Sequence, residues 1–160
     1  SAAAAQAGAP IVVTGSLEAI ERDEAPVSVT VVEEETIEAL ALPAAPDLLR
    51  LAPGVSVATT GPRGTQTQLR IRGAEASHTL LFVDGIRFND PAAGNEARFE
   101  LLTADLLSRI EVVRGPQSAL WGSEALGGVI AARTADPFLG RGFEGRADPG
   151  SLDTSRLAGA

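Results

Sequence analysis

The stretch from Leu69 to Gly85 constrains the fold of this chain most strongly, because it holds two runs with strand character. In the first run, LRIR at residues 69–72, aliphatic side chains alternate with arginines, so a strand would place the arginines together on one face. The second run, TLLFV at residues 79–83, is apolar without alternation, which predicts a strand covered on both faces. A covered strand beside one that carries two arginines predicts a small domain that offers positive charge to something outside itself.

The composition favours one domain and excludes several classes of function. The chain has 160 residues, of which 44% are hydrophobic, enough for a core of aliphatic side chains. Its net charge of −8 argues against binding to nucleic acid, because no basic stripe is available to replace phosphate counterions. The absence of cysteine excludes thiol chemistry and disulfides, and no apolar run approaches the roughly 20 residues that a membrane-spanning helix needs.

All 13 basic residues are arginine, and two explanations of this bias remain open. Arginine keeps its charge when it is partly buried and binds carboxylates through two parallel hydrogen bonds, which suits a surface that meets acidic groups. A GC-rich genome would produce the same bias.

Residues 1–26 predict a flexible N-terminal tail, because alanines, prolines and scattered acids leave little apolar surface to bury. The sequence AQA at residues 5–7 has the form of a signal-peptidase site, which fits either the remnant of an export signal or a plain flexible terminus. One run in the tail has strand character: Ile11, Val12, Val13, Thr14 and Gly15. This run is either a connector or a peptide that adds a strand to the sheet of another protein.

From residue 27 onward, strands and short helices alternate irregularly, which favours an α+β fold with a small mixed sheet of about four core strands. Strands are expected at residues 27–32, 55–58, 69–72, 79–83, 110–114 and 129–133. Helices are expected at residues 36–40 and 47–52, with Pro46 in the first turn of the second. A short helical segment capped by Thr103 is expected within residues 101–108, and an extended or turn piece at residues 118–122.

Two long polar loops, at residues 59–68 and 87–98, separate these elements. The composition changes after residue 137, where glycines recur. Asp148-Pro149-Gly150 predicts a turn between two weakly alternating segments. This last part predicts a hairpin that begins a different structure.

The sequence offers little support for an enzyme. A serine hydrolase would have to use Ser77, His78 and Asp84, but neighbours at the mouth of a strand point to opposite faces and do not converge. The segment WGSEA at residues 121–125 lacks the spacing of a nucleophile elbow, and residues 84–90 lack the spacing of a calcium loop. Neither catalytic residues, nor a cofactor, nor a metal site are therefore expected.

Three blocks of sequence, by their order and spacing, resemble the plug domain of TonB-dependent outer-membrane receptors. They read IRG at residues 71–73, TLLFVDGIR at residues 79–87 and IEVVRGPQSALWGSEALGGVI at residues 110–130. The segment LLRLAPGV at residues 48–55 is similar to the helix-to-strand segment of that family, and the turn AEASH at residues 74–78 is similar to that of its cobalamin receptors. The chain departs from the family at Ala131-Ala132, where Asn-Ile is usual, and at Trp121, where tyrosine is common.

The resemblance implies that residues 27–137 form a plug inside a barrel of about 22 strands in the outer membrane of a Gram-negative bacterium. Residues 1–26 would be a periplasmic tail, and residues 138–160 the start of the barrel. Within the tail, residues 11–15 would be the TonB box, which the C-terminal domain of TonB captures. Arg72 and Arg114 match the plug arginines of the family that face glutamates on the barrel wall.

The resemblance also implies a substrate surface and a transport function. Residues 59–68 and 88–97 match loops that touch a metal-chelate substrate, either a ferric siderophore or cobalamin. The residues expected to face it are Thr60, Arg63, Gln66, Phe88, Asn89, Asp90 and Asn95. The expected function is a gate that occludes the barrel, helps to bind the substrate and couples to TonB for energised uptake.

Two alternatives to a transporter gate remain open on the sequence. One is a free-standing periplasmic interaction module that has the plug fold without a transport role. The other is the hydrolase described above. With the barrel absent, the exposed arginine face also leads us to expect a homodimer of the isolated chain.

Overall fold

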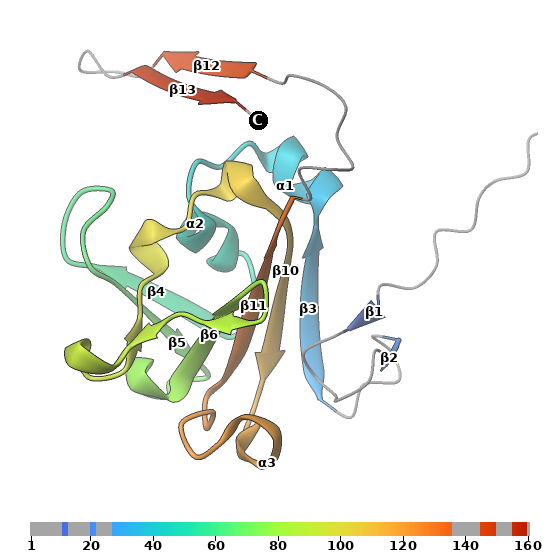
Figure 1. Cartoon of the computed structure of the whole chain (residues 1–160), viewed down its shortest axis with the longest axis vertical. Helices are drawn as coiled ribbons and strands as arrows, with labels where there is room; N and C mark the ends of the chain where they lie inside the picture. The colour runs from blue at the N-terminus through green and yellow to red at the C-terminus, as the bar shows by residue number, and fades with distance from the viewer. Residues whose placement is uncertain (1–10, 13–19, 22–26, 136–144, 150–154, 160) are drawn as a thin grey trace, which may run out of the picture.

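A computed structural model of the chain describes residues 11–12, 20–21, 27–135, 145–149 and 155–159 (Figure 1). Its centre is a sheet with the strand order β3-β10-β11-β6-β7. The strands are β3 (Ser28–Glu33), β10 (Leu107–Arg114), β11 (Gly128–Thr134), β6 (Thr79–Val83) and β7 (Ile86–Arg87). Neighbouring strands are antiparallel except β11 and β6, which are parallel. The sheet is mixed, so the predicted α+β fold with a small mixed sheet is confirmed.

Short helices and strand pairs accompany the sheet. The helices are α1 (Glu34–Leu40), α2 (Ala45–Leu49) and α3 (Ser118–Trp121), with 3₁₀ turns η2 (Ala76–His78), η3 (Pro91–Ala93), η4 (Phe99–Leu101) and η5 (Ala104–Leu106). The antiparallel pairs are β1 (Ile11–Val12) with β2 (Ile20–Glu21), β4 (Val55–Thr59) with β5 (Thr67–Ile71), β8 (Asn89–Asp90) with β9 (Glu96–Ala97), and β12 (Gly145–Pro149) with β13 (Ser155–Gly159).

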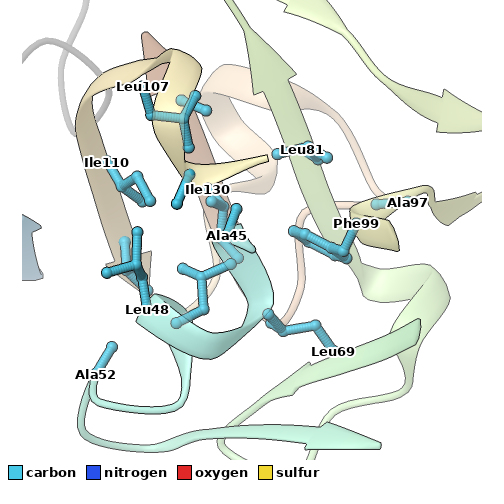
Figure 2. Packing of buried hydrophobic residues seen from close by; sticks show 14 of the residues in the cluster. Ala45, Leu48, Ala52, Leu69, Leu81, Ala97, Phe99, Leu107, Ile110 and Ile130 are labelled. Atoms are coloured by element: carbon cyan, nitrogen blue, oxygen red, sulfur yellow. The ribbon is translucent and has the colours of Figure 1, made fainter. Parts of the chain in front are cut away.

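Strand β6 is covered on both faces, as its unbroken apolar run predicts. Leu81 belongs to a large apolar cluster and the adjacent Leu80 to a smaller one, and both side chains are fully buried. Successive side chains of a strand point to opposite faces, so the two clusters cover opposite faces of the sheet. Figure 2 shows the large cluster, in which α2, β5, η4, β10 and β11 contribute Leu48, Leu69, Phe99, Ile110 and Ile130. This core holds the arginine-bearing hairpin against the sheet.

The helix signals in the sequence are largely confirmed. Helix α1 carries Glu34 and Glu35 in its first turn, where carboxylates suit the helix dipole. It ends at Ala41, whose backbone is left-handed with φ 52°. Helix α2 has Pro46 in its first turn, as predicted, but spans residues 45–49 and so begins and ends earlier than expected.

The arginine-bearing strand has the predicted two faces but a different neighbour. In β5, Leu69 and Ile71 are buried while Arg70 is exposed. The prediction that it lies beside the covered strand of the sheet is wrong, because β5 pairs with β4, with Val55 opposite Ile71. The buried side chains of β5 pack into the large cluster, and β5 is not a strand of the central sheet.

One local prediction is wrong. Residues 118–122 hold helix α3, in which the carbonyl of Gln117 accepts hydrogen bonds from the amides of Leu120 and Trp121. Packing favours this turn, since the Trp121 ring lies 4.7 Å from that of Phe82. Within residues 101–108, the expected short helical segment is the 3₁₀ turn η5, and Thr103 occupies its N-cap position but makes no side-chain cap bond. The C-terminal hairpin is confirmed as β12 and β13, although residues 148–149 lie in β12 and not in the turn.

Candidate functional site

Arg72 and Arg114, both predicted to face outward, lie side by side next to Gly54. A methyl group built on Gly54 would lie 3.7 Å from Cγ of Arg72 and 3.8 Å from Cδ of Arg114. Arg114 ends β10 and is half-buried, and its guanidinium donates a 2.8 Å hydrogen bond to the carbonyl of Pro53. Arg72 follows β5 and is exposed. Among the described residues, no carboxylate lies within 4.0 Å of either guanidinium.

The local backbone explains why two like charges meet here. Arg72 has a left-handed backbone with φ 52°, and its amide donates a 2.8 Å hydrogen bond to the carbonyl of Gly54. Gly73 continues the turn with φ 78°, a conformation that glycine adopts without strain. Burial, and secondarily the charge of Arg72, lower the pKa of Arg114 from its usual value. The site is therefore a positive surface whose charges are not balanced within the described part of the chain.

The predicted loop at residues 59–68 is shorter than expected: Thr59 belongs to β4 and residues 67–68 belong to β5, so residues 60–66 form the hairpin connection. The amide and hydroxyl of Thr60 both donate to the carbonyl of Gln66, over 3.2 and 3.4 Å, which closes the loop. Thr65 also donates its hydroxyl to the carbonyl of Pro62, over 2.8 Å. Arg63 lies at the exposed tip. Three predicted residues, Thr60, Arg63 and Gln66, thus share one exposed loop.

The second predicted loop, residues 88–97, is held together mainly by the side chain of Asn89. Its oxygen accepts a 2.9 Å hydrogen bond from the amide of Leu81, and its nitrogen donates to the carbonyls of Thr79 and Asn95, over 3.1 and 2.8 Å. Asn95 in turn donates to the carbonyl of Ser77 over 3.3 Å. Phe88 is 37% exposed. The amides of Asn89 and Asn95 therefore position the loop, while Phe88 presents an apolar surface.

Asp90 is an ion-pair partner inside the same loop. Its carboxylate accepts hydrogen bonds from Arg98 over 2.8 and 3.1 Å and from the amide of Ala92 over 2.9 Å. The Arg98 hydrogen bond, followed by that of Ala92, holds the pKa of Asp90 below its usual value. The same bond raises the pKa of Arg98. Arg98 also reaches Glu100 at 3.4 Å.

The two loops are joined through Glu96, which sequence reasoning missed. Its carboxylate accepts hydrogen bonds from Gln66 over 3.0 Å and from Gln68 over 2.8 Å. The neighbouring Glu100 accepts one from the amide of Thr67 over 3.3 Å. The sequence offers only a weak indication of these contacts, which is that the carboxylates of Glu96 and Glu100 flank Arg98 at alternate positions. The structure thus brings the predicted substrate loops together.

A serine triad is ruled out by the position of Asp84. Its carboxylate accepts hydrogen bonds from both the amide and the hydroxyl of Thr134, over 2.9 and 2.7 Å. Asp84 lies in the turn after β6, whereas Ser77 and His78 belong to the turn before it, so a strand separates them. Within the described ranges, no group of three or more His, Cys, Asp or Glu residues is placed to hold a metal ion. The described residues also include no helix of the length and apolar character needed to cross a membrane.

Comparison with known proteins decides the family. The sequence profile described as "TonB-dependent Receptor Plug Domain" matches residues 21–129, more than half of the chain. The chain belongs to this family. It is 38% identical over 131 residues to the vitamin B12 transporter BtuB of Vibrio vulnificus, an alignment that covers 82% of this chain and 21% of BtuB.

Solved structures agree with the assignment of a plug domain. FpvA of P. aeruginosa, solved with heterologous pyoverdines bound, has a TM-score of 0.74 at 25% identity and is matched over 92% of this chain and 19% of FpvA. The siderophore receptor PirA of Acinetobacter baumannii has a TM-score of 0.60 at 27% identity, over 81% of this chain and 21% of PirA. The plug chain thus spans about a fifth of the length of these relatives, of which BtuB is named a transporter, PirA is named a receptor and none is named an enzyme.

The predicted TonB box of the plug is only partly described. Ile11 and Val12 form β1, which pairs with β2, so the predicted tail has at least one strand pair. Val13, Thr14 and Gly15 lie outside the described residues. The assignment of residues 11–15 as a TonB box, like the division of the chain at residues 26 and 137, stays a prediction.

The paired arginines of the plug give a prediction for the isolated chain. Replacing Arg72 by alanine is expected to raise the free energy of unfolding by about 0.5 kcal/mol in low salt, because it removes the repulsion on Arg114. The gain should shrink in high salt, which screens the repulsion in the wild type. Urea denaturation at two ionic strengths measures both effects. Arg63→Ala removes the same charge from an exposed loop and serves as the control; an equal gain in that variant would contradict the pairing.

Proposed function

We propose that this domain closes the lumen of an outer-membrane transporter in a Gram-negative bacterium, and that TonB opens it by pulling on residues 11–15. The observation that carries the proposal is the pair formed by Arg72 and Arg114, whose charges have no carboxylate partner among the described residues. Such a pair becomes favourable when acidic groups approach from outside, as glutamates on a barrel wall would. Partly desolvated pairs of arginine with carboxylate are stronger than exposed ones.

A polar contact suits a gate that has to move. A dry apolar seam between plug and barrel would oppose every displacement with the cost of exposing hydrophobic area to water. Ion pairs with water around them can exchange partners for solvent at a modest cost. The positive surface at Arg72 and Arg114 therefore supports a plug that is held in place but remains releasable.

The proposed substrate is a metal chelate. Relatives carry the names of a vitamin B12 transporter and of siderophore receptors, so both substrate classes are represented among them. In this chain, the joined loops expose Thr60, Arg63 and Phe88, a mixture of polar, cationic and aromatic groups suited to an organic chelate. Asn89, Asp90 and Asn95 serve this surface by holding the loop in shape.

Capture by TonB would be strand addition at residues 11–15. About four main-chain hydrogen bonds, at ~1 kcal/mol each, make the contact weak before ordering costs are counted. The pairing of β1 with β2 supports the idea that this segment accepts a strand neighbour, and TonB would either replace β2 or add to the other edge of β1. A weak and exchangeable contact suits a partner that pulls and then releases.

Uptake by the whole receptor that carries this domain tests the proposal. Cells that lack their own receptors and express it should accumulate labelled cyanocobalamin or ferric enterobactin, and only when TonB is present. Accumulation of either probe at the same rate in cells without TonB would contradict energised gating. Accumulation of neither probe would contradict uptake of the two chelates for which these relatives are named.

A further inference from the structure

The side chain of Arg87 connects two segments that are far apart in the sequence. Arg87 ends β7, at the edge of the sheet. Its Nη2 donates to the side-chain oxygen of Asn95, in the loop of residues 88–97, and to the carboxylate of Glu124, in the segment of residues 115–127. One guanidinium thus holds together the loop of residues 88–97 and the α3 segment, which comprises residues 115–127.

The α3 segment and the beginning of β3 pack against the same small apolar cluster. Ala125 is fully buried in the smaller cluster, and Trp121 packs against the same cluster. Val27 and Val29, which follow directly on the N-terminal tail, pack against it too. Figure 1 shows α3 in the connection from the end of β10 to the start of β11, on the side of the sheet where β3 begins. The shared cluster is therefore a route by which the packing of Val27 and Val29 can act on the segment that carries Glu124.

The α3 segment is also closed on itself, so it can move as one piece. The amide of Gly115 donates to the carbonyl of Gly127 over 3.1 Å, and the amide of Gln117 donates to that of Ala125 over 2.8 Å. One further bond, from the amide of Gly127 to the carbonyl of His78 over 3.0 Å, attaches the segment to the start of β6. Displacement of this closed loop would move Glu124 relative to Arg87.

Asn95, the second partner of Arg87, closes the loop of residues 88–97 through its hydrogen bonds. Its amide donates to the carbonyl of Asp90 over 2.9 Å, and its carbonyl accepts from the side chain of Asn89 over 2.8 Å. Its backbone is left-handed with φ 62°, a conformation that its neighbours have to maintain. Withdrawal of Arg87 from Asn95 would loosen the loop at this point.

We propose that Arg87 is a positioning residue that couples the packing of the start of β3 to the conformation of residues 88–97. The inference rests on the proposed function, in which the tail is pulled and this loop holds the substrate. Force on the tail first removes Val27 and Val29 from the smaller cluster, which frees the α3 segment and draws Glu124 and Arg87 away from Asn95. By reciprocity, a substrate that fixes the loop would favour the packed state of β3.

Amide hydrogen exchange in the whole 160-residue chain tests this coupling without TonB or substrate. Val29→Ala weakens the smaller cluster, and it should speed exchange of the Asn95 and Phe88 amides about twofold to fivefold, the effect of losing one exposed ion pair. Val32→Ala is the matched control, since Val32 lies in the same strand and packs against the large cluster on the other face. Its effect on both amides should be the same with and without Arg87, because the large cluster includes Ala97 of the loop itself and does not act through Glu124. The slower exchange of the Val112 amide, from the core of β10, reports global unfolding in every variant.

The decisive comparison repeats the hydrogen-exchange measurement in variants that lack the contact between Arg87 and Glu124. In Arg87→Ala, the Asn95 amide should exchange faster from the start, and adding Val29→Ala should bring no further increase. Glu124→Gln, which keeps Arg87, should also abolish the effect of Val29→Ala. Equal acceleration by Val29→Ala with and without Arg87 would overturn the proposal, as would no acceleration in the wild-type background. Because neither TonB nor a chelate is present, a failure here is distinct from a failure of the transport function.

Discussion

Replacing Gly128 by alanine is expected to destabilise the folded chain by about 4 kcal/mol or more. A methyl group at this position would lie 2.3 Å from the carbonyl oxygen of Val113 and 2.9 Å from Cδ1 of Ile71. The backbone oxygen belongs to β10, the partner strand of β11, so it cannot move aside without breaking the ladder between them. The backbone of Gly128 also has φ 153°, which side chains rarely adopt. Both effects act on the first residue of a central strand.

Gly64→Ala is the control for Gly128→Ala. Gly64 has φ 88° and nothing within 4 Å of the added methyl group, so the change should cost only about 1–2 kcal/mol of backbone strain. Urea or thermal denaturation of the two variants measures the difference. Similar losses in both would show that β11 can shift to accept a side chain, which would contradict the tight contact among β10, β11 and Ile71.

The patterns that fix which side of a strand is buried could be read from the sequence. Alternation at residues 69–72 correctly predicted buried Leu69 and Ile71 beside exposed arginines, and the unbroken run at residues 79–83 correctly predicted a strand covered on both faces. Hydrophobic periodicity indicates whether each side chain of a strand is buried or exposed. It does not report partners, which is why the neighbour of the arginine-bearing strand was predicted wrongly.

The candidate site depended on contacts that no local pattern carries. Arg72 and Arg114 stand 42 positions apart in the sequence, and they meet because both bind the Pro53-Gly54 turn, Arg72 through its amide and Arg114 through its guanidinium. Likewise, Glu96 joins the two predicted loops through Gln66 and Gln68, which lie on another hairpin. These contacts follow from how the hairpins pack on the core, and only the three-dimensional fold contains that information.

Loss of TonB binding is the second large effect that we expect. Scrambling residues 11–15 keeps the composition and charge of the tail but removes the order of side chains that a strand partner would read. Residues 27–135, which hold the core, are untouched, so the stability of the domain should not change. Binding should therefore fall below detection while the fold remains intact. This separates a recognition defect from unfolding.

Recruitment of TonB through residues 11–15 is tested by titrating the isotope-labelled chain with the C-terminal domain of TonB and following the NMR signals. Because about 4 kcal/mol is the gross sum before ordering costs, the dissociation constant would be on the order of 1 mM or weaker, a range in which NMR detects binding. We predict that the signals of residues 11–15 shift on addition of TonB and that the scrambled chain shows no such shifts at the same concentrations. Equal shifts in the scrambled chain would contradict recruitment of TonB through residues 11–15.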